Sequence, residues 1–263
     1  MMKLRTNNLN GFNHVLSNRE FNERVMQTFA LYNNAMPDVW ALQEVPVGGK
    51  KHICIKQLQN LAIQHGYTMI MPEKTSWKVS EHPKSIQSVL LLKGAKNIEV
   101  LKLDDSIELY NRYNYVKAEF DGVEYYILNI HAPQTELFPG HKENDGYVRL
   151  RKYLAKQFYD VLKAEISKLI ASGKRIIVLG DFNKNLDQPE VQELIVLGLE
   201  NIASTNDNTY YCTGNNTSDS VDHILVSQNI AETVDSAKCS IDVDFVKVQK
   251  LSDHATVDLD IAI

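Results

Sequence analysis

The sequence has little of what would mark a secreted, membrane-spanning or disulfide-bonded protein. Its 263 residues include three cysteines, Cys54, Cys212 and Cys239, with no C-x-x-C spacing. A disulfide framework or a zinc ribbon is therefore not expected, and three reduced thiols fit the cytoplasm. No apolar run approaches the roughly 20 residues that a transmembrane helix needs, and the N-terminal sequence lacks the apolar stretch of a signal peptide. We expect a cytoplasmic protein.

The chain also lacks an excess of positive charge. It has 28 lysines and arginines against 33 acidic residues, a net charge of −5. This balance argues against a protein that coats nucleic acid by bulk charge, although a local basic groove remains compatible with it. No linker rich in proline, glycine or serine and no short repeat divides the sequence. We therefore predict a single domain over residues 1–263, and a monomer.

Three helices are predicted from the spacing of apolar residues. The first begins with a capping-box sequence, in which serine is followed three residues later by glutamate. The second and third each stop at a glycine, which is common just after the end of a helix. The predicted helices cover about residues 17–37, 51–65 and 147–173.

Several predicted strands adjoin a polar residue that can bind a metal or transfer a proton. The apolar runs at 39–42, 125–130 and 175–179 are followed by Glu44, His131 and Asp181, and the alternating run at 256–263 follows Asp253 and His254. Each polar residue alone could cap a turn or a strand. Their recurrence at strand ends instead predicts an active site along one edge of a sheet, with rigid strands presenting the chemistry.

Together these side chains could hydrolyse a phosphate ester. Glu44 and Asp253 supply anionic oxygens, which favour Mg²⁺ or Mn²⁺ over zinc. Asp181 can orient and deprotonate a water molecule. Two histidines can share phosphate stabilisation and proton transfer. We therefore expect a Mg²⁺-dependent hydrolase of phosphate esters, with Mn²⁺ as an alternative cofactor.

Seven short motifs occur in order across nearly the whole chain. They are Asn8-Leu9-Asn10-Gly11, Leu42-Gln43-Glu44, Ser88-Val89-Leu90-Leu91, His131-Ala132-Pro133, Gly180-Asp181-Phe182-Asn183, Asp222-His223-Ile224-Leu225-Val226-Ser227 and Ser252-Asp253-His254. In this order the chain resembles the endonuclease/exonuclease/phosphatase superfamily, which includes deoxyribonuclease I, abasic-site endonucleases, neutral sphingomyelinases and inositol polyphosphate 5-phosphatases. The resemblance implies an α/β (α+β) fold, a deoxyribonuclease I-like four-layer α/β/β/α sandwich of two mixed sheets.

The resemblance also implies which residues serve the metal and the attacking water. Asn8 and Glu44 would be metal ligands or lie next to the metal, with Asp253 close by. Asp181 would position the attacking water. Asn183 would brace Asp181 and donate a hydrogen bond to the phosphate.

By the same resemblance, two histidines would face the phosphate from different sides. His254, oriented by Asp222, would contact the phosphate, and His131 would face the leaving group. The chain departs from the family at two positions. Asn10 replaces the charged residue that several nucleases carry, which puts a second metal or phosphate contact there in doubt. Gln87 lies where deoxyribonuclease I has the carboxylate that orients the leaving-side histidine, and could act as a neutral partner.

The substrate is less well defined by the sequence. A histidine at 131, where abasic-site endonucleases carry tyrosine, fits the deoxyribonuclease I-like, toxin-nuclease, sphingomyelinase and 5-phosphatase branches. We expect surface loops at 82–88, 133–145 and 204–220 over the site. Basic residues near these loops could follow phosphates, or simply be solvated, and aromatic residues could stack on bases. These residues are Lys50, Lys51, Lys74, Lys78, Lys84, Lys142, Arg149, Arg151, Trp77, Phe138, Tyr210 and Tyr211.

Three functions remain open at this point. The expected one is a nuclease that acts on DNA or RNA phosphodiesters. The alternative is a phosphatase or a sphingomyelinase-like phosphodiesterase acting on a small or lipid phosphoester, which needs a membrane-inserting apolar loop or a dense cationic cup. Neither feature stands out in the sequence. A catalytically inactive binding module is the third, and the complete catalytic set argues against it.

Overall fold

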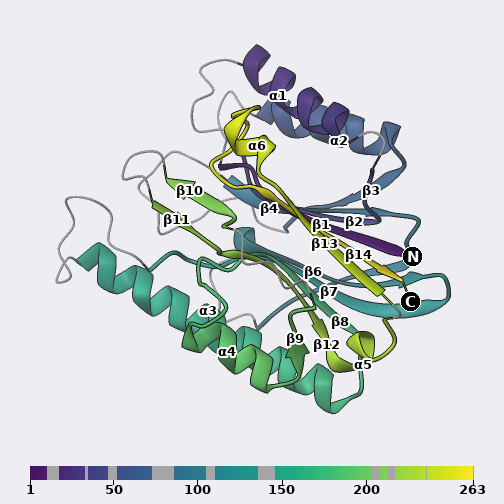
Figure 1. Cartoon of the computed structure of the whole chain (residues 1–263), viewed down its shortest axis with the longest axis vertical. Helices are drawn as coiled ribbons and strands as arrows, with labels where there is room; N and C mark the ends of the chain where they lie inside the picture. Colours follow the sequence, from purple (N-terminus) through teal and green to yellow (C-terminus); the bar gives the residue numbers. More distant parts are fainter. Residues whose placement is uncertain are drawn as a thin grey trace.

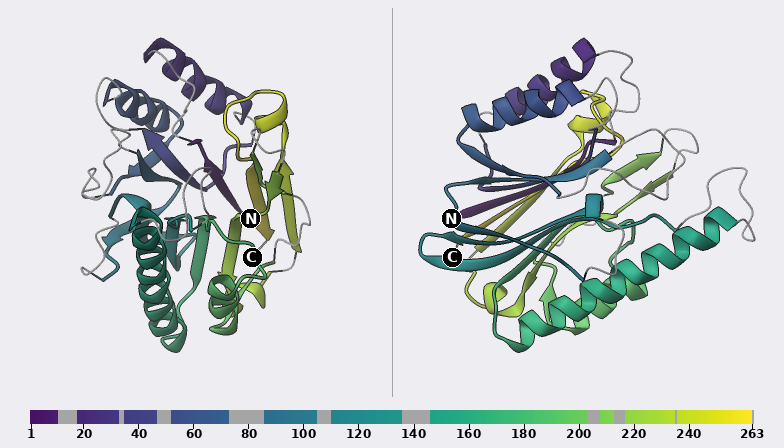
Figure 2. Two further views of the ribbon diagram at one scale, coloured as in Figure 1. Left: turned by 90° about the vertical axis from the view of Figure 1, so that its left-hand side faces the viewer. Right: turned by 180° about the vertical axis from the view of Figure 1, so that it is seen from behind.

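The computed structural model describes residues 1–10, 18–32, 35–46, 52–72, 86–104, 110–135, 146–202, 208–212, 217–234 and 236–262. Two six-stranded sheets lie face to face between outer helices (Figures 1 and 2). Helices α1 (Asn18–Leu31) and α2 (His52–Gln64) cover the first sheet, and α3 (Gly146–Ala171) and α4 (Pro189–Val196) cover the second. The prediction of a four-layer α/β/β/α sandwich of mixed sheets is confirmed.

The first sheet brings both ends of the chain together. Its strand order is β13 (Ser236–Asp242), β14 (Thr256–Ala262), β1 (Met2–Asn8), β2 (Val39–Pro46), β4 (Ile86–Lys93) and β3 (Tyr67–Ile70). β1 and β2 are parallel, and the other neighbours are antiparallel. The end of β1 therefore lies beside the start of β14.

The second sheet has a similar design around one parallel pair. Its order is β5 (Lys96–Leu101), β6 (Tyr113–Phe120), β7 (Val123–His131), β8 (Ile176–Asp181), β12 (Asp222–Ser227) and β9 (Leu199–Glu200). β7 and β8 are parallel, with α3 as the connection. The smaller elements are η3 (Tyr110–Arg112), the hairpin β10 (Tyr210–Cys212) and β11 (Thr217–Asp219), α5 (Gln228–Ala231) and α6 (Asp244–Lys247).

Strand β8 shows why an unbroken apolar run forms a strand here. Ile177 and Leu179 pack in the core between the sheets, whereas Ile176 and Val178 pack in the core under α3. Side chains of a strand alternate between its two faces. Since both faces of β8 are covered, every position of its apolar part is hydrophobic.

Two predicted loops are wrong in part. Residues 86–88 were expected in a loop but begin β4, where Gln87 and Ser88 are buried. Residues 210–212 and 217–219 form the β10–β11 hairpin rather than an irregular loop. Both stretches are polar, and tertiary burial overrides that local signal. The first helix also ends at Leu31 instead of reaching residue 37. Ser17 and residues 82–85, 136–145, 204–207 and 213–216 lie outside the described residues.

Membrane crossing by a helix finds no support in the part of the chain that is described. None of its helices has the length and apolar character that spanning a bilayer requires.

Candidate active site

Strand pairing brings the predicted site residues to one edge of the two sheets. His131 ends β7 opposite Asp181, which ends β8, and Asp222 begins β12 opposite Asp181 from the other side. In the first sheet, Asn8 ends β1 near His254, which precedes β14. The carboxyl ends of parallel strands meet at the same edge, and an antiparallel neighbour begins there. This edge lies at the β10–β11 end of the molecule, away from the two chain termini (Figure 1).

Gly180 permits the close approach of β7 and β8 at this edge. A Cβ atom on Gly180 would lie 2.0 Å from the carbonyl oxygen of Ile130, and the φ angle of Gly180 is +144°. Any larger residue would push β8 away from β7. The glycine therefore sets the position of Asp181 next to His131.

Asp181 is held by both of its carboxylate oxygens. Oδ1 accepts a hydrogen bond from the backbone N–H of Asn183 at 2.7 Å, and Oδ2 accepts one from Asn8 Nδ2 at 2.8 Å. Burial and then the negative charge of Asp222 raise the pKa of Asp181 to about 7. A carboxylate with a pKa near neutrality is suited to accept a proton from water.

His131 lies between two carboxylates in the pocket. Its Nε2 is 3.4 Å from Glu44 Oε1 and 3.7 Å from Asp181 Oδ2. Glu44 is presented by a bulge in β2 and has a φ angle of +52°. Burial and then the positive charge of Arg112 lower the pKa of His131 well below its ordinary value. His131 is therefore neutral at neutral pH.

The predicted partnership between Gln87 and His131 is wrong. Gln87 is 1% exposed, and neither its side-chain nitrogen nor its oxygen has a hydrogen-bond partner within the described chain. The side chain of Gln87 lies on the helix-covered face of β4, as do Val89 and Leu91. The carboxylates beside His131 are instead Glu44, from β2, and Asp181, from β8.

The charges around His254 favour its protonated form, in contrast to those around His131. Its Nδ1 is hydrogen-bonded to Asp222 Oδ2 at 2.9 Å, and its Nε2 is 3.9 Å from Asp253 Oδ1. Burial opposes a charge on His254, but Asp222 and the nearby Asp181 and Asp253 outweigh it and raise its pKa to about 10. His254 is therefore an imidazolium at neutral pH. The structure thus places Asp222 where it can orient His254.

The two site asparagines act within the pocket as hydrogen-bonding braces. Asn8 Oδ1 accepts the backbone N–H of Asn10 at 2.8 Å, and its amide nitrogen bonds Asp181. Asn183 has a φ angle of +50°, and its Nδ2 donates to Ala132 O at 2.8 Å. The Asn8 side chain also donates a hydrogen bond to Glu44, so its amide nitrogen faces the carboxylates of Glu44 and Asp181.

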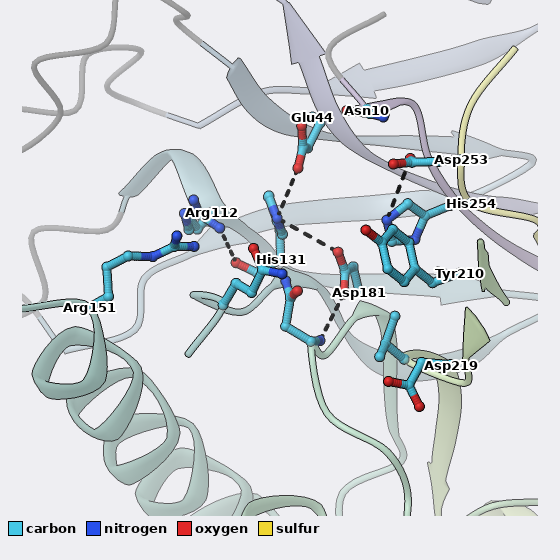
Figure 3. A pocket seen from close by; sticks show the side chains of 13 residues that line it. Asn10, Glu44, Arg112, His131, Arg151, Asp181, Tyr210, Asp219, Asp253 and His254 are labelled. Carbon is cyan, nitrogen blue, oxygen red and sulfur yellow. Dashed lines mark hydrogen bonds and ion pairs between the residues drawn. The ribbon is translucent and has the colours of Figure 1, made fainter. Parts of the chain in front are cut away.

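The site is a polar pocket of about 350 Å³, a size typical of small-ligand sites. Figure 3 shows Arg112 and Arg151 on one side of Asp181, and Tyr210, Asp253 and His254 on the other. The full lining is Asn10, Glu44, Arg112, His131, Gln134, Arg151, Asp181, Asn183, Tyr210, Asp219, Val221, Asp253 and His254.

Sequence reasoning missed Arg112, Gln134, Asp219 and Val221. Arg112 is 6% exposed, and its Nη1 donates to the carbonyl oxygens of His131 and Ala132, each at 3.4 Å. A charged residue directly before an alternating strand suggests a solvated strand end. One feature could have pointed to Arg112: it directly precedes β6, the strand that pairs with β7, which ends on His131.

Only some of the residues expected to contact phosphates or stack on bases line the pocket. Arg151 and Tyr210 line the pocket, whereas Arg149 is exposed and Tyr211 packs against Lys247, with 5.1 Å between ring centroid and Nζ. The remaining residues lie outside the described part of the chain: Lys50, Lys51, Lys74, Lys78, Lys84, Lys142, Trp77 and Phe138.

Among the described residues, two sets of side chains could hold a cation. Ligand atoms of Asp181, Asp222 and His254 lie within 4.8 Å of one another, and this buried group is consistent with a metal site. A cation bound by all three would, however, break the Asp222–His254 hydrogen bond. Glu44 and Asp253 offer a second set, with Asn8 beside it.

The second set has features of a cation site. Asp253 Oδ1 is buried and has no hydrogen-bond partner among the described residues. Burial chiefly raises the pKa of Glu44, and the negative charge of Asp253 adds to the increase. A divalent cation would relieve both effects, and these oxygen donors suit a hard cation.

Comparison with known proteins identifies a family match over most of the chain. Residues 8–254 match the description "Endonuclease/Exonuclease/phosphatase family". No curated protein matches the chain significantly.

Solved structures match the whole fold at low sequence identity. The 3′ phosphatase NExo from Neisseria, bound to a product DNA hairpin, is 18% identical with a TM-score of 0.68, and the match covers 100% of both chains. An AP endonuclease from Archaeoglobus fulgidus is 15% identical with a TM-score of 0.70, again over 100% of both chains. Truncated TDP2 from Caenorhabditis elegans is 16% identical with a TM-score of 0.69, covering 100% of this chain and 97% of that one. At such identities these likenesses establish the fold.

Proposed function

This chain belongs to the Endonuclease/Exonuclease/phosphatase family, and we propose that it hydrolyses phosphodiester bonds of DNA or RNA with the help of Mg²⁺ or Mn²⁺. The family membership makes it a phosphoester hydrolase. One observation carries the hydrolytic chemistry: the buried carboxylate of Asp181, fixed by two hydrogen bonds, lies close to both His131 and His254.

The chemistry follows from the charge states of these side chains. Asp181 accepts a proton from the attacking water, and Asn8 and Asn183 fix the direction of its carboxylate. Charged His254 stabilises the negative charge that grows on the phosphate oxygens. As the water oxygen bonds to phosphorus, the bond from phosphorus to the leaving oxygen breaks; neutral His131 donates a ring N–H hydrogen bond to that oxygen, which then takes a proton from solvent.

A divalent cation fits the carboxylate oxygens of Glu44 and Asp253, with the Asn8 side chain beside them. When bound, it would lower the cost of forming hydroxide and offset phosphate charge. The same residues orient the site in its absence, because Asn8 bonds to Asp181 and Glu44 lies 3.4 Å from His131.

The two ends of the pocket favour a nucleic acid as the substrate. Arg112 and Arg151 lie on the His131 side, where the phosphate next to the scissile one can be bound (Figure 3). Tyr210 on the opposite side offers a ring on which a base can stack. A phosphocholine headgroup instead calls for an aromatic cage around its cation, and two arginines would repel that cation.

The test compares substrates under the same conditions. Nicking of a supercoiled plasmid and cleavage of a short fluorescent DNA or RNA strand are measured with Mg²⁺, with Mn²⁺ and with chelator, beside bis(p-nitrophenyl) phosphate, sphingomyelin vesicles and a phosphate monoester. We expect cation-dependent cleavage of nucleic acid and of the generic diester. Faster turnover of sphingomyelin or of the monoester would replace the nuclease proposal with the alternative substrate class. Full activity in chelator would contradict the cation proposal.

A further inference from the structure

The contact between Asp222 and His254 joins two different sheets. Asp222 begins β12 in the second sheet, whereas His254 directly precedes β14 in the first. Their hydrogen bond of 2.9 Å therefore depends on how the two sheets are aligned at this edge. A small slip of one sheet against the other would lengthen it.

Thr209 forms hydrogen bonds to the backbone near the start of β12 and to the backbone just before β14. Its Oγ1 accepts hydrogen bonds from the N–H groups of Val221 and Asp222, both at 3.0 Å. Its carbonyl oxygen accepts one from the N–H of Ala255 at 2.6 Å. Thr209 is 1% exposed. One buried residue is thus bonded to Asp222 and to the residue that follows His254.

The hairpin strengthens the link to His254. Tyr211 N–H donates to Asp253 O at 2.9 Å, and Tyr210 forms a β-bridge with His254. The centroids of the Tyr210 and His254 rings are 4.9 Å apart. Figure 3 shows the two side chains next to each other. Residues on both sides of His254 are therefore paired with the segment that Thr209 begins.

We propose that Thr209 is a positioning residue, which holds Asp222 and His254 in register across the two sheets. This inference rests on the proposed phosphoesterase function. Since the hydroxyl of Thr209 serves two buried backbone N–H groups, valine would keep its shape but leave those groups without their acceptor. Serine would keep the acceptor and lose one methyl group. The two substitutions therefore separate the hydroxyl from the shape.

The first test uses kinetics on bis(p-nitrophenyl) phosphate. Thr209→Val should lower kcat by about 10- to 100-fold with little change in KM, the scale expected when a catalytic group is misplaced by a fraction of an ångström. Thr209→Ser should restore most of the turnover. Thr28→Val is the matched control, because Thr28 is buried in α1 and its hydroxyl bonds Arg24 O. If Thr209→Val destabilises the fold, Thr209→Ala removes the hydroxyl with less steric demand. Unchanged kcat in a folded variant that lacks the hydroxyl would overturn the proposal.

A double-mutant cycle distinguishes positioning from general stability. If Thr209 acts through His254, Thr209→Val should cause almost no further loss of kcat in a His254→Ala background. A merely structural role would instead multiply the two losses. Full multiplication of the losses is therefore the result that rejects the positioning role.

A spectroscopic measurement separates this inference from the proposed function. The proton on Nδ1 of His254, bonded to a carboxylate, should give a low-field proton resonance in the wild type that is absent from Asp222→Asn. Thr209→Val should weaken this resonance or shift it upfield, and Thr209→Ser should retain it. Wild-type protein that hydrolyses no phosphodiester would contradict the proposed function, while this resonance still tests Thr209. An unchanged resonance in Thr209→Val would refute the inference even in an active enzyme.

Discussion

The two sides of the pocket bury a histidine to a similar degree but leave one ring neutral and the other positively charged. His131 is 5% exposed and His254 is 7% exposed. The pKa of His131 lies well below its ordinary value, whereas that of His254 is about 10. Burial disfavours the charged form of both rings. The difference therefore comes from their neighbours.

Those neighbours come from strands far apart in the sequence. Arg112 precedes β6, and its positive charge lowers the pKa of His131. Asp222 begins β12 and hydrogen-bonds His254. One histidine thus remains a neutral donor, and the other supplies a fixed positive charge. The comparison teaches that burial together with the sum of the surrounding charges, rather than the nearest polar group alone, sets the charge of a buried ring.

The largest expected effect is at Asp181, which lies between the two sides. Asp181→Asn keeps the size and hydrogen-bonding reach of the side chain but removes the base. We expect kcat to fall by roughly 10²- to 10⁴-fold with KM little changed, the range for a lost general base. Steady-state kinetics and a melting curve measure this. If Asp181 only forms the turn to Asn183, the asparagine variant should retain its activity.

Removing either histidine should cost somewhat less. His131→Ala and His254→Ala should each lower kcat by roughly 10²-fold, and both variants should stay folded. A variant with near wild-type turnover would assign that histidine to a structural role.

Replacing Asp222, the partner of His254, should change the pH dependence of kcat. In Asp222→Asn the carboxylate that raises the pKa of His254 is gone, so that pKa should fall. Because the charge on His254 exists below its pKa and is lost above it, the alkaline limit of activity should move to lower pH. A pH profile of kcat for wild type and variant measures the shift. An unchanged alkaline limit would show that deprotonation of His254 does not cause the loss of activity at high pH.

The carboxylates of Glu44 and Asp181 should make cation binding depend on pH. Burial raises the pKa of both, that of Asp181 to about 7. A cation favours the ionised forms, so binding should release protons, and affinity should rise as pH increases through about 7. Calorimetry of Mn²⁺ binding in buffers of different ionisation enthalpy measures the protons released. Glu44→Gln should weaken binding, and excess cation should partly restore its activity; unchanged binding would remove Glu44 from the ligands.

The smallest effect on kinetics is expected from replacing Arg151. Arg151→Gln should raise KM for a DNA or RNA strand several-fold and leave bis(p-nitrophenyl) phosphate nearly unchanged, because that diester has no second phosphate. Exposed Lys168, also on α3, gives the control variant Lys168→Gln. An equal effect on both substrates would show that Arg151 does not read the neighbouring phosphate.

The sequence pointed to the residues that gather in the pocket better than to the residues that hold them in place. Polar residues at the ends of apolar strands identified His131 and Asp181, because each signal is local to one strand. Arg112 and Thr209 escaped notice, since their roles arise from contacts between distant segments. Thr209, for example, lies in a stretch whose polar composition suggested a loop, and its partners Asp222 and Ala255 become neighbours only in the folded chain.

A buried polar network under the site shows the same limitation. Gln43 Nε2 donates to Asn129 Oδ1 at 2.7 Å across the two sheets, and Asn129 Nδ2 donates to Asn114 Oδ1 at 2.9 Å. The apolar runs at 39–42 and 125–130 predict two of these strands but do not reveal which strands face one another. The layer count could therefore be predicted from the family resemblance alone, and the pairing of these amides came from the structure.

The charge states of the two histidines can be measured directly. Side-chain ¹H–¹⁵N spectra of the cation-free protein, assigned with His131→Ala and His254→Ala, report how many ring nitrogens carry a proton. Near neutral pH we predict one protonated nitrogen on His131 and two on His254. Asp222→Asn should move His254 toward the neutral pattern and leave His131 unchanged. A charged His131, or a neutral His254 in the wild type, would contradict the division of the pocket into a neutral and a cationic side.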